Sequence, residues 1–585
     1  MFFAIIFLFS IFSFLLTPIC QATPEFTVTE KIEYLFSLSG QATVTHQITL
    51  TNNFSQIYPT EYQIQIQGLP LSDLSASDEQ GNILSDFSQQ NDLSTIKLKF
   101  NEAKVGKNQS TSFKLIYRIA NLAKNKGKTW EITLPETVED VPTSSEISLK
   151  TPSQFGSLSF ASVNVKFEDG LTQNITTFNN NSGSKILIIF GNYQLFDFTL
   201  NYHLKNPNST KVSSEIALIP DTYSQSVYYQ SISPPPKSIN IDEDGNWLAQ
   251  YEINPGEEMD IVAVGQVKTG INLPQTTKNL ENYLLPQKFW PTDDPQIQTL
   301  SDKVKTPRSI YDYVISTLNY DFSRVGNASR LGAIEALNNP QSALCTEFTD
   351  LFITLARASG IPAREIQGFA YSTDQKIKPL SLNNDILHAW PEYYDSNSKL
   401  WKAIDPTWGK TTSGIDYFNN LDLNHITFVT HGLNSEYPLP AGSYQKDQNT
   451  KSVYIDFAKE DLKYEQTFPS LYLKKNKLIL QNRSPNSQKN ISISSDKISF
   501  LKEIDKILPY SSLEIELPKI SFLKSLSTKN QKITFTLTSL EGQTQTQSLN
   551  YPPHFINLGI FIVLSLIILS ISGIIITNLT HEKNT

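Results

Sequence analysis

Cysteine, histidine and aspartate residues occur in this chain in an order that suits a thiol nucleophile. The 585 residues include two cysteines, Cys20 in an apolar N-terminal segment and Cys345 further along. Exported proteins usually keep cysteine for disulfides, and a lone cysteine cannot form one within its own chain. Cys345 is therefore a candidate catalytic nucleophile, with His388 and Asp405 as its partners. The alternative is a small buried core residue.

The residues after Cys345 predict an amphipathic helix that begins at the cysteine and stops at Gly360. In the first turn of a helix, unpaired N–H groups and the positive end of the dipole favour a thiolate and lower its pKa. The same groups can stabilise an oxyanion, with the Cys345 N–H as first donor and Gln341 as a candidate for the second. The predicted buried face carries apolar residues at helical spacing: Leu344, Phe348, Leu351, Phe352 and Leu355.

Residues 387–394 and 399–405 predict an antiparallel hairpin. If Ser396-Asn397 is a two-residue turn, His388 lies opposite Asp405 on one face, about 5 Å away. A carboxylate in that position orients an imidazole and fixes its tautomer. A slip of one residue would instead put the two side chains on opposite faces. Pro391 requires an edge position or a missing N–H that faces outward.

Two tryptophans near this hairpin, Trp390 and Trp408, are candidates for walling the site, although plain core packing explains them equally well. No metal-ligand set is apparent in the sequence, and nothing in it requires a cofactor. Four further histidines are expected to be ordinary surface or core residues: His46, His203, His425 and His431.

Three segments, 345–364, 387–394 and 401–408, resemble the nucleophile helix and the histidine and aspartate strands of the transglutaminase-like superfamily. The resemblance extends over about 307–414, and a weaker one links 24–81 to the β-rich domains that often precede such enzymes. Pro391 departs from the family, which commonly has an aliphatic residue there.

This resemblance implies an α+β papain-like core with Cys345 as nucleophile, His388 as base and Asp405 as orienting acid. It also implies an acyl-transfer enzyme that attacks amide bonds of peptides or proteins and forms a thioester. An amine would then complete a crosslink, whereas water would make the enzyme an amidase or peptidase. The alternative is a non-catalytic surface binding or adhesion protein with the same fold.

Both ends of the chain are apolar and carry no charged side chain in their apolar runs. Residues 1–22 read as a signal peptide, and 555–577 are long enough to predict a transmembrane helix followed by a tail at 578–585. These segments predict a single-pass membrane protein with its ectodomain outside the cell. The expected partner is then a peptide, protein or cell-wall substrate at the cell surface.

The formal net charge of −9 argues against nucleic acid as a partner. Period-two alternation of apolar and polar residues, as in 42–51, predicts antiparallel strands on both sides of the catalytic region. The expected fold class is multidomain: N-terminal all-β domains, the α+β catalytic domain, a C-terminal all-β module and the C-terminal transmembrane helix. The predicted boundaries between the two ends are 23–121, 122–270, 280–440 and 451–550.

Overall fold

The computed structural model divides the chain into two compact units, one of Met1–Asn125 with Trp130–Phe190 and one of Lys126–Thr129 with Gly191–Thr585. Strands hold 48% of the residues and helices 14%. The predicted signal peptide at 1–22 lies outside the described residues. The structure describes 24–581 without 92, 103, 139–143, 181–185, 274, 276–278, 327–328, 373–375, 381–386, 413–414, 420, 448–449, 463–466, 475–476, 496–497, 499, 519–530 and 552–554.

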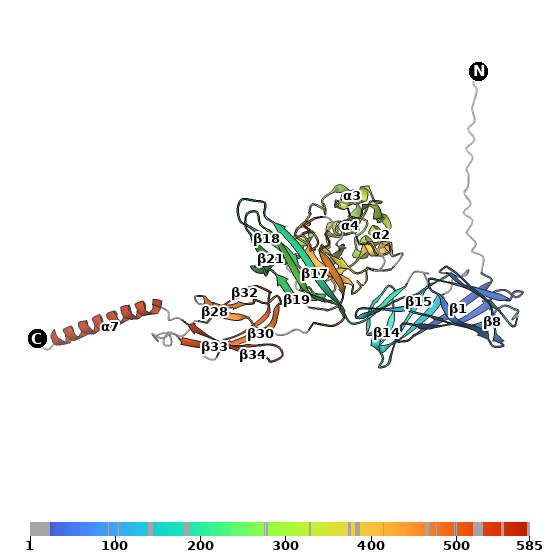
Figure 1. Ribbon diagram of the computed structural model, residues 1–585, viewed down its shortest axis with the longest axis horizontal. Helices are drawn as coiled ribbons and strands as arrows, with labels where there is room; N and C mark the ends of the chain where they lie inside the picture. The colour runs from blue at the N-terminus through green and yellow to red at the C-terminus, as the bar shows by residue number, and fades with distance from the viewer. Residues whose placement is uncertain are drawn as a thin grey trace, which may run out of the picture. The chain divides into compact units, whose positions relative to one another are not determined.

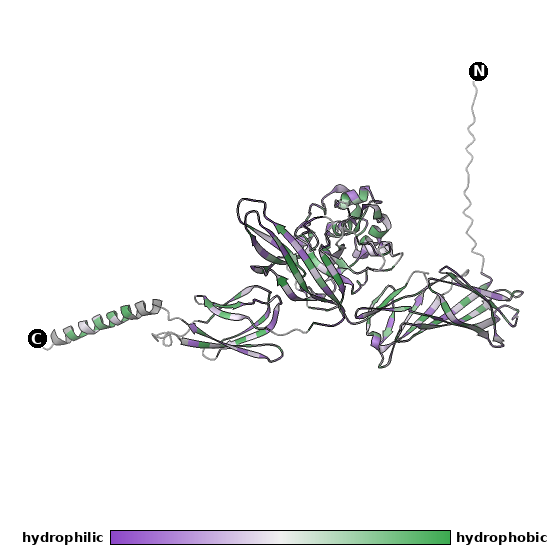
Figure 2. Ribbon diagram, in the orientation of Figure 1, coloured by the Kyte–Doolittle hydropathy of each residue, from purple (hydrophilic) through white to green (hydrophobic). Residues whose placement is uncertain are grey.

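The first unit consists of antiparallel-rich sheets around one apolar core (Figure 1). Its sheets have the orders β14-β15-β12-β1-β2-β8-β4-β5, β13-β16-β10-β9 and β11-β3-β7-β6. Apolar and polar residues alternate along long strands such as β1 and β2 (Figure 2), so that one face of each of these strands is buried. Its strands are β1 (Phe26–Phe36), β2 (Ala42–Asn52), β3 (Glu61–Gln67), β4 (Leu71–Asp78), β5 (Gly81–Asn82), β6 (Leu84–Gln90), β7 (Leu93–Lys99), β8 (Ser110–Ile119), β9 (Ala123–Lys126), β10 (Thr129–Thr133), β11 (Glu136–Val138), β12 (Ser144–Pro152), β13 (Leu158–Ala161), β14 (Lys166–Glu168), β15 (Gln173–Asn180) and β16 (Leu187–Phe190).

The second unit begins with two sheets of the orders β19-β22-β17-β27 and β18-β21-β20. Their core includes Phe369, Ile426 and Phe428 from the sheet that follows, so the two parts share one apolar interior. These strands are β17 (Gln194–Lys205), β18 (Val212–Leu218), β19 (Gln225–Ser233), β20 (Ser238–Ile241), β21 (Trp247–Ile253), β22 (Glu258–Thr269) and β27 (Val453–Phe457).

The helices gather around the sheet β25-β24-β23-β26. At their centre α4 (Cys345–Ala358) buries every residue from Cys345 to Arg357, because strands cover one side and helices the others. Gly360 follows α4 with a φ of 78°, the left-handed stop that the sequence predicts. The other elements are α1 (Pro295–Ser301), α2 (Pro307–Thr317), α3 (Ala333–Asn338), α5 (Pro406–Thr411), β23 (Ala363–Ala370), β24 (His388–Asp395), β25 (Leu400–Ala403) and β26 (His425–His431).

Two further sheets, β28-β29-β32 and β31-β30-β33-β34, enclose a small apolar core near the C-terminus. Their strands are β28 (Ser470–Lys474), β29 (Lys477–Gln481), β30 (Gln488–Ser495), β31 (Leu501–Ile507), β32 (Ser512–Glu516), β33 (Gln531–Thr538) and β34 (Thr544–Tyr551).

The last element is the helix α7 (Phe555–His581). Within the described part of the chain, no helix combines the length and the apolar character that a membrane crossing requires. The expected fold class, with its transmembrane helix at 555–577, is therefore wrong in that element.

Candidate active site

Cys345 occupies the first position of α4, where the helix presents N–H groups that its own hydrogen-bond ladder does not use. The side chain is completely buried. Glu347, also buried, fixes the entry into the helix because its carboxylate accepts from the backbone N–H groups of Leu344 and Leu331, each at 2.8 Å. The start of α4 is thus held in place by a carboxylate two residues after the cysteine.

His388 opens β24 and lies opposite Gly368 of β23. At Gly368 the register between β23 and β26 shifts, and a Cβ there would lie 2.0 Å from the Ile426 carbonyl oxygen. Only glycine permits this close approach of the two backbones. The missing side chain therefore lets β26 lie tightly against the strand that supports His388.

Asp405 lies just beyond the hairpin, and here the predicted register is wrong. Tyr394 pairs with Trp401, so the turn is two residues longer than the sequence suggested and Asp405 follows the end of β25. It is the N-cap of α5: Oδ1 accepts from the Trp408 N–H at 3.0 Å. Oδ2 accepts from Nε2 of His388 at 2.9 Å. One carboxylate thus caps a helix and orients the imidazole.

The predicted difficulty at Pro391 is resolved by its position. Its carbonyl accepts from the Ile404 N–H at 3.1 Å, so its backbone polar groups point toward β25. The β24–β25 ladder begins only at Glu392, paired with Ala403. The missing N–H therefore falls at the end of the ladder, where no strand partner needs it.

The electrostatics of this group favour a charged imidazole. Burial lowers the pKa of His388, but the charge and hydrogen bond of Asp405, with the neighbouring Cys345 thiol, raise it to about 9. Burial raises the pKa of Asp405, but His388 and His425 bring it down to about 2. These shifts favour an imidazolium at neutral pH, with Nε2 bonded to Asp405 and the Cys345 thiol beside the ring. A cation beside a thiol stabilises the thiolate.

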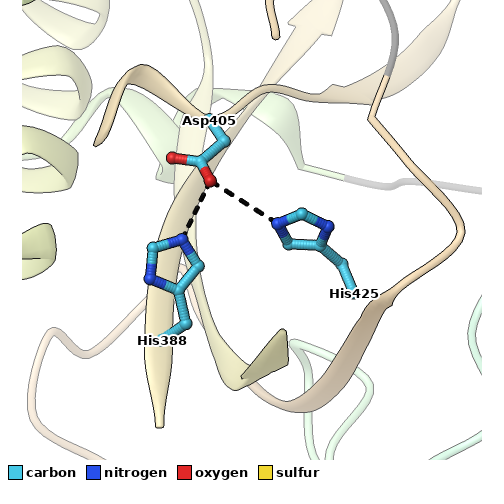
Figure 3. A group of neighbouring side chains, drawn as sticks. All are labelled: His388, Asp405 and His425. Carbon is cyan, nitrogen blue, oxygen red and sulfur yellow. Dashed lines mark hydrogen bonds and ion pairs between the residues drawn. The ribbon is translucent and has the colours of Figure 1, made fainter. Parts of the chain in front are cut away.

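A second histidine, which the sequence interpretation treated as ordinary, shares Asp405. Nε2 of His425 lies 3.5 Å from Asp405 Oδ2, and Nδ1 lies 2.8 Å from Asp422 Oδ1. Figure 3 shows Asp405 between the two imidazoles. His425 starts β26, which joins the sheet beside β23. One usable signal was present in the sequence: a histidine at the start of a largely apolar segment, three residues after Asp422.

His388, Asp405 and His425 each offer one potential metal ligand, with these atoms within 4.8 Å of one another and all three side chains buried. The His388–Asp405 hydrogen bond already joins two of them directly at 2.9 Å. An ion would have to replace the bond that orients His388. The arrangement fits a hydrogen-bonded acid–base group better than a metal centre.

The two candidate tryptophans pack on these histidines. Trp408 stacks on His388 with ring centroids 5.1 Å apart, and Trp390 meets His425 edge-on at 5.0 Å. Both indoles are buried, so they form dry walls around the imidazoles. Gln341 instead lies exposed in the turn before α4, and no described contact joins it to Cys345.

Two amide side chains from the preceding β-sheets form hydrogen bonds along the open edge of β26: Gln225 at the start of β19 and Asn246 just before β21. Gln225 donates to the Thr427 carbonyl and accepts from the Thr427 N–H, both at 2.8 Å. Asn246 does the same at Thr430, at 2.9 and 2.7 Å. Each amide replaces a missing neighbouring strand, so these β-sheets help to position His425.

Comparison with known proteins supports the resemblance that the motifs suggested. Residues 292–406 match the model of the transglutaminase-like superfamily, which confirms that resemblance for this part of the chain. That superfamily is one of cysteine enzymes, and the match is consistent with cysteine-dependent chemistry here. No curated protein matches the chain.

Solved structures that resemble part of the chain include a putative cysteine protease and a periplasmic domain. A putative cysteine protease from Cytophaga hutchinsonii is 17% identical, with 46% of this chain and 87% of that one covered and a TM-score of 0.30. The periplasmic domain of TgpA from Pseudomonas aeruginosa is 13% identical, with 38% and 91% covered and a TM-score of 0.23. Likenesses this distant carry no argument about the activity of this chain.

Proposed function

From the transglutaminase-like match at 292–406, we propose that the protein is a cysteine-dependent acyl-transfer enzyme that acts on amide bonds. The observation that carries the proposal is a buried His388–Asp405 pair beside a cysteine at the start of a helix. This combination supplies a nucleophile, a proton carrier and a group that orients the carrier.

In the first half-reaction, the Cys345 thiolate attacks the amide carbonyl carbon and forms a C–S bond. The negative charge on the carbonyl oxygen is stabilised at the first turn of α4. The C–N bond then breaks, and the His388 imidazolium gives its proton to the leaving nitrogen. Asp405 stays ionised throughout and keeps the imidazole in position.

In the second half-reaction, an amine or water attacks the thioester and neutral His388 takes its proton. The C–S bond breaks and the thiolate is restored with its imidazolium partner. An amine acceptor makes a crosslink, whereas water makes a hydrolysis product. We propose a peptide, protein or cell-wall amide as the substrate class, and a location outside the cell stays a prediction from the apolar N-terminus.

A second candidate function has one observation in its favour. Cys345, His388 and Asp405 are all completely buried. A thiol enclosed in this way also suits a binding module that retains the fold without turnover. The two functions differ in the chemical state of the thiol, because only the enzyme needs a thiolate–imidazolium pair.

The deciding experiment is the pH dependence of Cys345 alkylation in the full-length protein. Peptide mass spectrometry separates Cys345 from Cys20, and His388→Ala is compared with wild type. A free thiol with a pKa near 8.5 is about 1% thiolate at pH 6.5, so loss of the pair slows alkylation there by up to roughly 100-fold. Equal, slow labelling of both proteins, with one step near pH 8.5, would favour the binding module.

A further inference from the structure

His425 has carboxylates at both ring nitrogens. Asp422 Oδ1 lies 2.8 Å from Nδ1, and Asp405 Oδ2 lies 3.5 Å from Nε2. A neutral imidazole carries only one N–H. It would therefore turn a lone pair toward one of the two carboxylates inside a buried site. Only the doubly protonated ring can direct an N–H toward both carboxylates, so the geometry on its two sides favours a cation.

The surroundings of His425 are consistent with a stable positive charge. The charged groups that face it are Asp422, Asp405 and, across Asp405, His388, whose ring centroid is 5.9 Å away. Burial lowers the pKa of His425, but Asp422 and Asp405 raise it above its usual value. The indoles of Trp390 and Trp408 also pack against it.

The charges form an alternating series that ends at the nucleophile. Lys378 contacts Asp422 at 3.4 Å and lies over the Trp408 ring. Tyr417, packed against the same indole, is held protonated, since burial raises its pKa, an effect that Lys378 only partly offsets. With all members ionised the series carries three positive and three negative charges: Lys378, Asp422, His425, Asp405, His388 and Cys345.

We propose that His425 is a positioning residue for the acyl-transfer reaction: as a cation on the far side of Asp405, it lowers the affinity of His388 for its proton. This proposal rests on the proposed function. The imidazolium of His388 must release its proton to the leaving nitrogen, and Asp405 opposes that release because it raises the pKa of His388. His425 divides the attraction of Asp405 between two rings and adds a like charge near His388.

The sign of the effect follows from these contacts. Replacing His425 with glutamine removes a positive charge near His388 and leaves the negative Asp405 and Asp422 in place. The loss of this positive charge, with both negative charges retained, favours the protonated form of His388. Charges at 4–6 Å shift a pKa by roughly 1–3 units. Because water can fill the space that the smaller glutamine leaves and screen the charges, we expect the pKa of His388 to rise by about one unit.

The test uses the same alkylation reaction, which needs no substrate. A thiolate beside an imidazolium gives two steps as pH rises: the pair forms in the lower one, and His388 loses its proton in the upper one. In full-length H425Q we expect the upper step about one pH unit higher than in wild type. The matched control is H431Q, which removes another buried histidine of β26, one that bonds Glu365 and the Pro438 carbonyl instead of Asp405.

A purely structural role for His425 would move the upper step equally in H425Q and H431Q, or in neither, and would overturn the proposal. A single step near pH 8.5 in the alkylation profile of wild type has a different meaning. It would contradict the proposed function, and the inference about His425 would fail with it. The same assay with a chelator and then with added Zn²⁺ identifies a metal: an upper step that H425Q moves only when Zn²⁺ is present would also overturn the proposal.

A measurement on the wild type decides the matter if H425Q does not fold. Histidine C2 hydrogen–deuterium exchange, followed by peptide mass spectrometry, reports the protonation of each imidazole separately. We expect His425 to remain an imidazolium at pH 7, well above the ordinary pKa of about 6.5. A neutral His425 at pH 7 would overturn the proposal without any substitution.

Discussion

The first unit and the catalytic sheet each bury a histidine bonded to a carboxylate, and only one of them is arranged for chemistry. In the first unit, Nδ1 of His46 bonds Glu30 at 2.6 Å and Nε2 bonds the Tyr117 hydroxyl at 2.7 Å. The second oxygen of Glu30 accepts from Ser145. Both ring nitrogens are thus committed, and the network joins four strands of one sheet.

In the catalytic sheet, by contrast, His388 interacts with the Cys345 thiol, and Nε2 of His425 lies 3.5 Å from Asp405; neither Nδ1 of His388 nor Nε2 of His425 has regular hydrogen-bond geometry. A buried ring nitrogen without a well-formed hydrogen bond costs free energy. In the first unit, both nitrogens of a buried histidine form such bonds. The difference teaches that a histidine–carboxylate pair alone is a poor mark of catalysis. The informative feature is an uncommitted nitrogen that faces a nucleophile.

The largest expected effect comes from neutralising the carboxylate of the catalytic network. Asp405→Asn keeps the shape of the side chain but removes the charge that raises the pKa of His388. We expect Cys345 alkylation at pH 6.5 to fall by about tenfold to 100-fold, since each pKa unit is worth a factor of ten. The measurement is the alkylation rate in the full-length protein.

Glu30→Gln in the first unit is the matched change for this prediction. It should leave the alkylation rate of Cys345 as in wild type, because Glu30 has no part in the series of charges that ends at the thiol. An equal fall in both variants would mean that the two networks do not differ in the way described here.

The position of the nucleophile Cys345 at the start of a helix could be predicted from local sequence patterns. The helix start at Cys345 and its stop at Gly360 depend on capping and spacing, which short stretches encode. The transglutaminase-like motifs then identified the order of Cys345, His388 and Asp405. None of this required knowledge of distant contacts.

The parts that escaped prediction depend on contacts between distant segments. The hairpin is longer by two residues, and because strand faces repeat every two residues Asp405 still lies on the side of His388. His425 reaches Asp405 only because β26 lies beside β23, a pairing that no local pattern reveals. At the C-terminus, apolar composition alone predicted a membrane span that the described residues do not support.

A second prediction concerns how closely the strands approach in the two regions. In Gly368→Ala the new Cβ would lie 2.0 Å from the Ile426 carbonyl oxygen, so β26 must move away from β23. We expect the second unit to lose about 2–4 kcal/mol of unfolding free energy. Because the displaced strand carries His425, the upper step of Cys345 alkylation should also change.

The first unit offers an equivalent glycine as the control for this prediction. A Cβ on Gly40 would also lie 2.0 Å from a carbonyl oxygen, that of Ala123, and Gly40 has a φ of 80°. Gly40→Ala should destabilise the first unit by at least as much, yet leave Cys345 alkylation unchanged. Urea unfolding followed by hydrogen-exchange mass spectrometry separates the two units. A changed alkylation profile in Gly40→Ala would contradict the distinction.

The smallest expected effect is the acid response of the first unit. Burial raises the pKa of Glu30, but its bonds to His46 and Ser145 outweigh this, and the pKa lies below its ordinary 4.5. A carboxyl with a depressed pKa stabilises the fold above the unfolded value, and this contribution is lost as pH falls through the folded value. The first unit should therefore lose stability below about pH 4.5, and Glu30→Gln should remove this part of the loss. Urea midpoints of β1 and β2, obtained by equilibration at pH 3 to 6 and a labelling pulse at one common pH, measure it. If the midpoints of the variant fall with acid as steeply as those of wild type, Glu30 is not the group whose protonation destabilises the first unit. The network of Glu30 would then differ from that of Asp405 in the charge of its carboxyl group as well as in its hydrogen bonding.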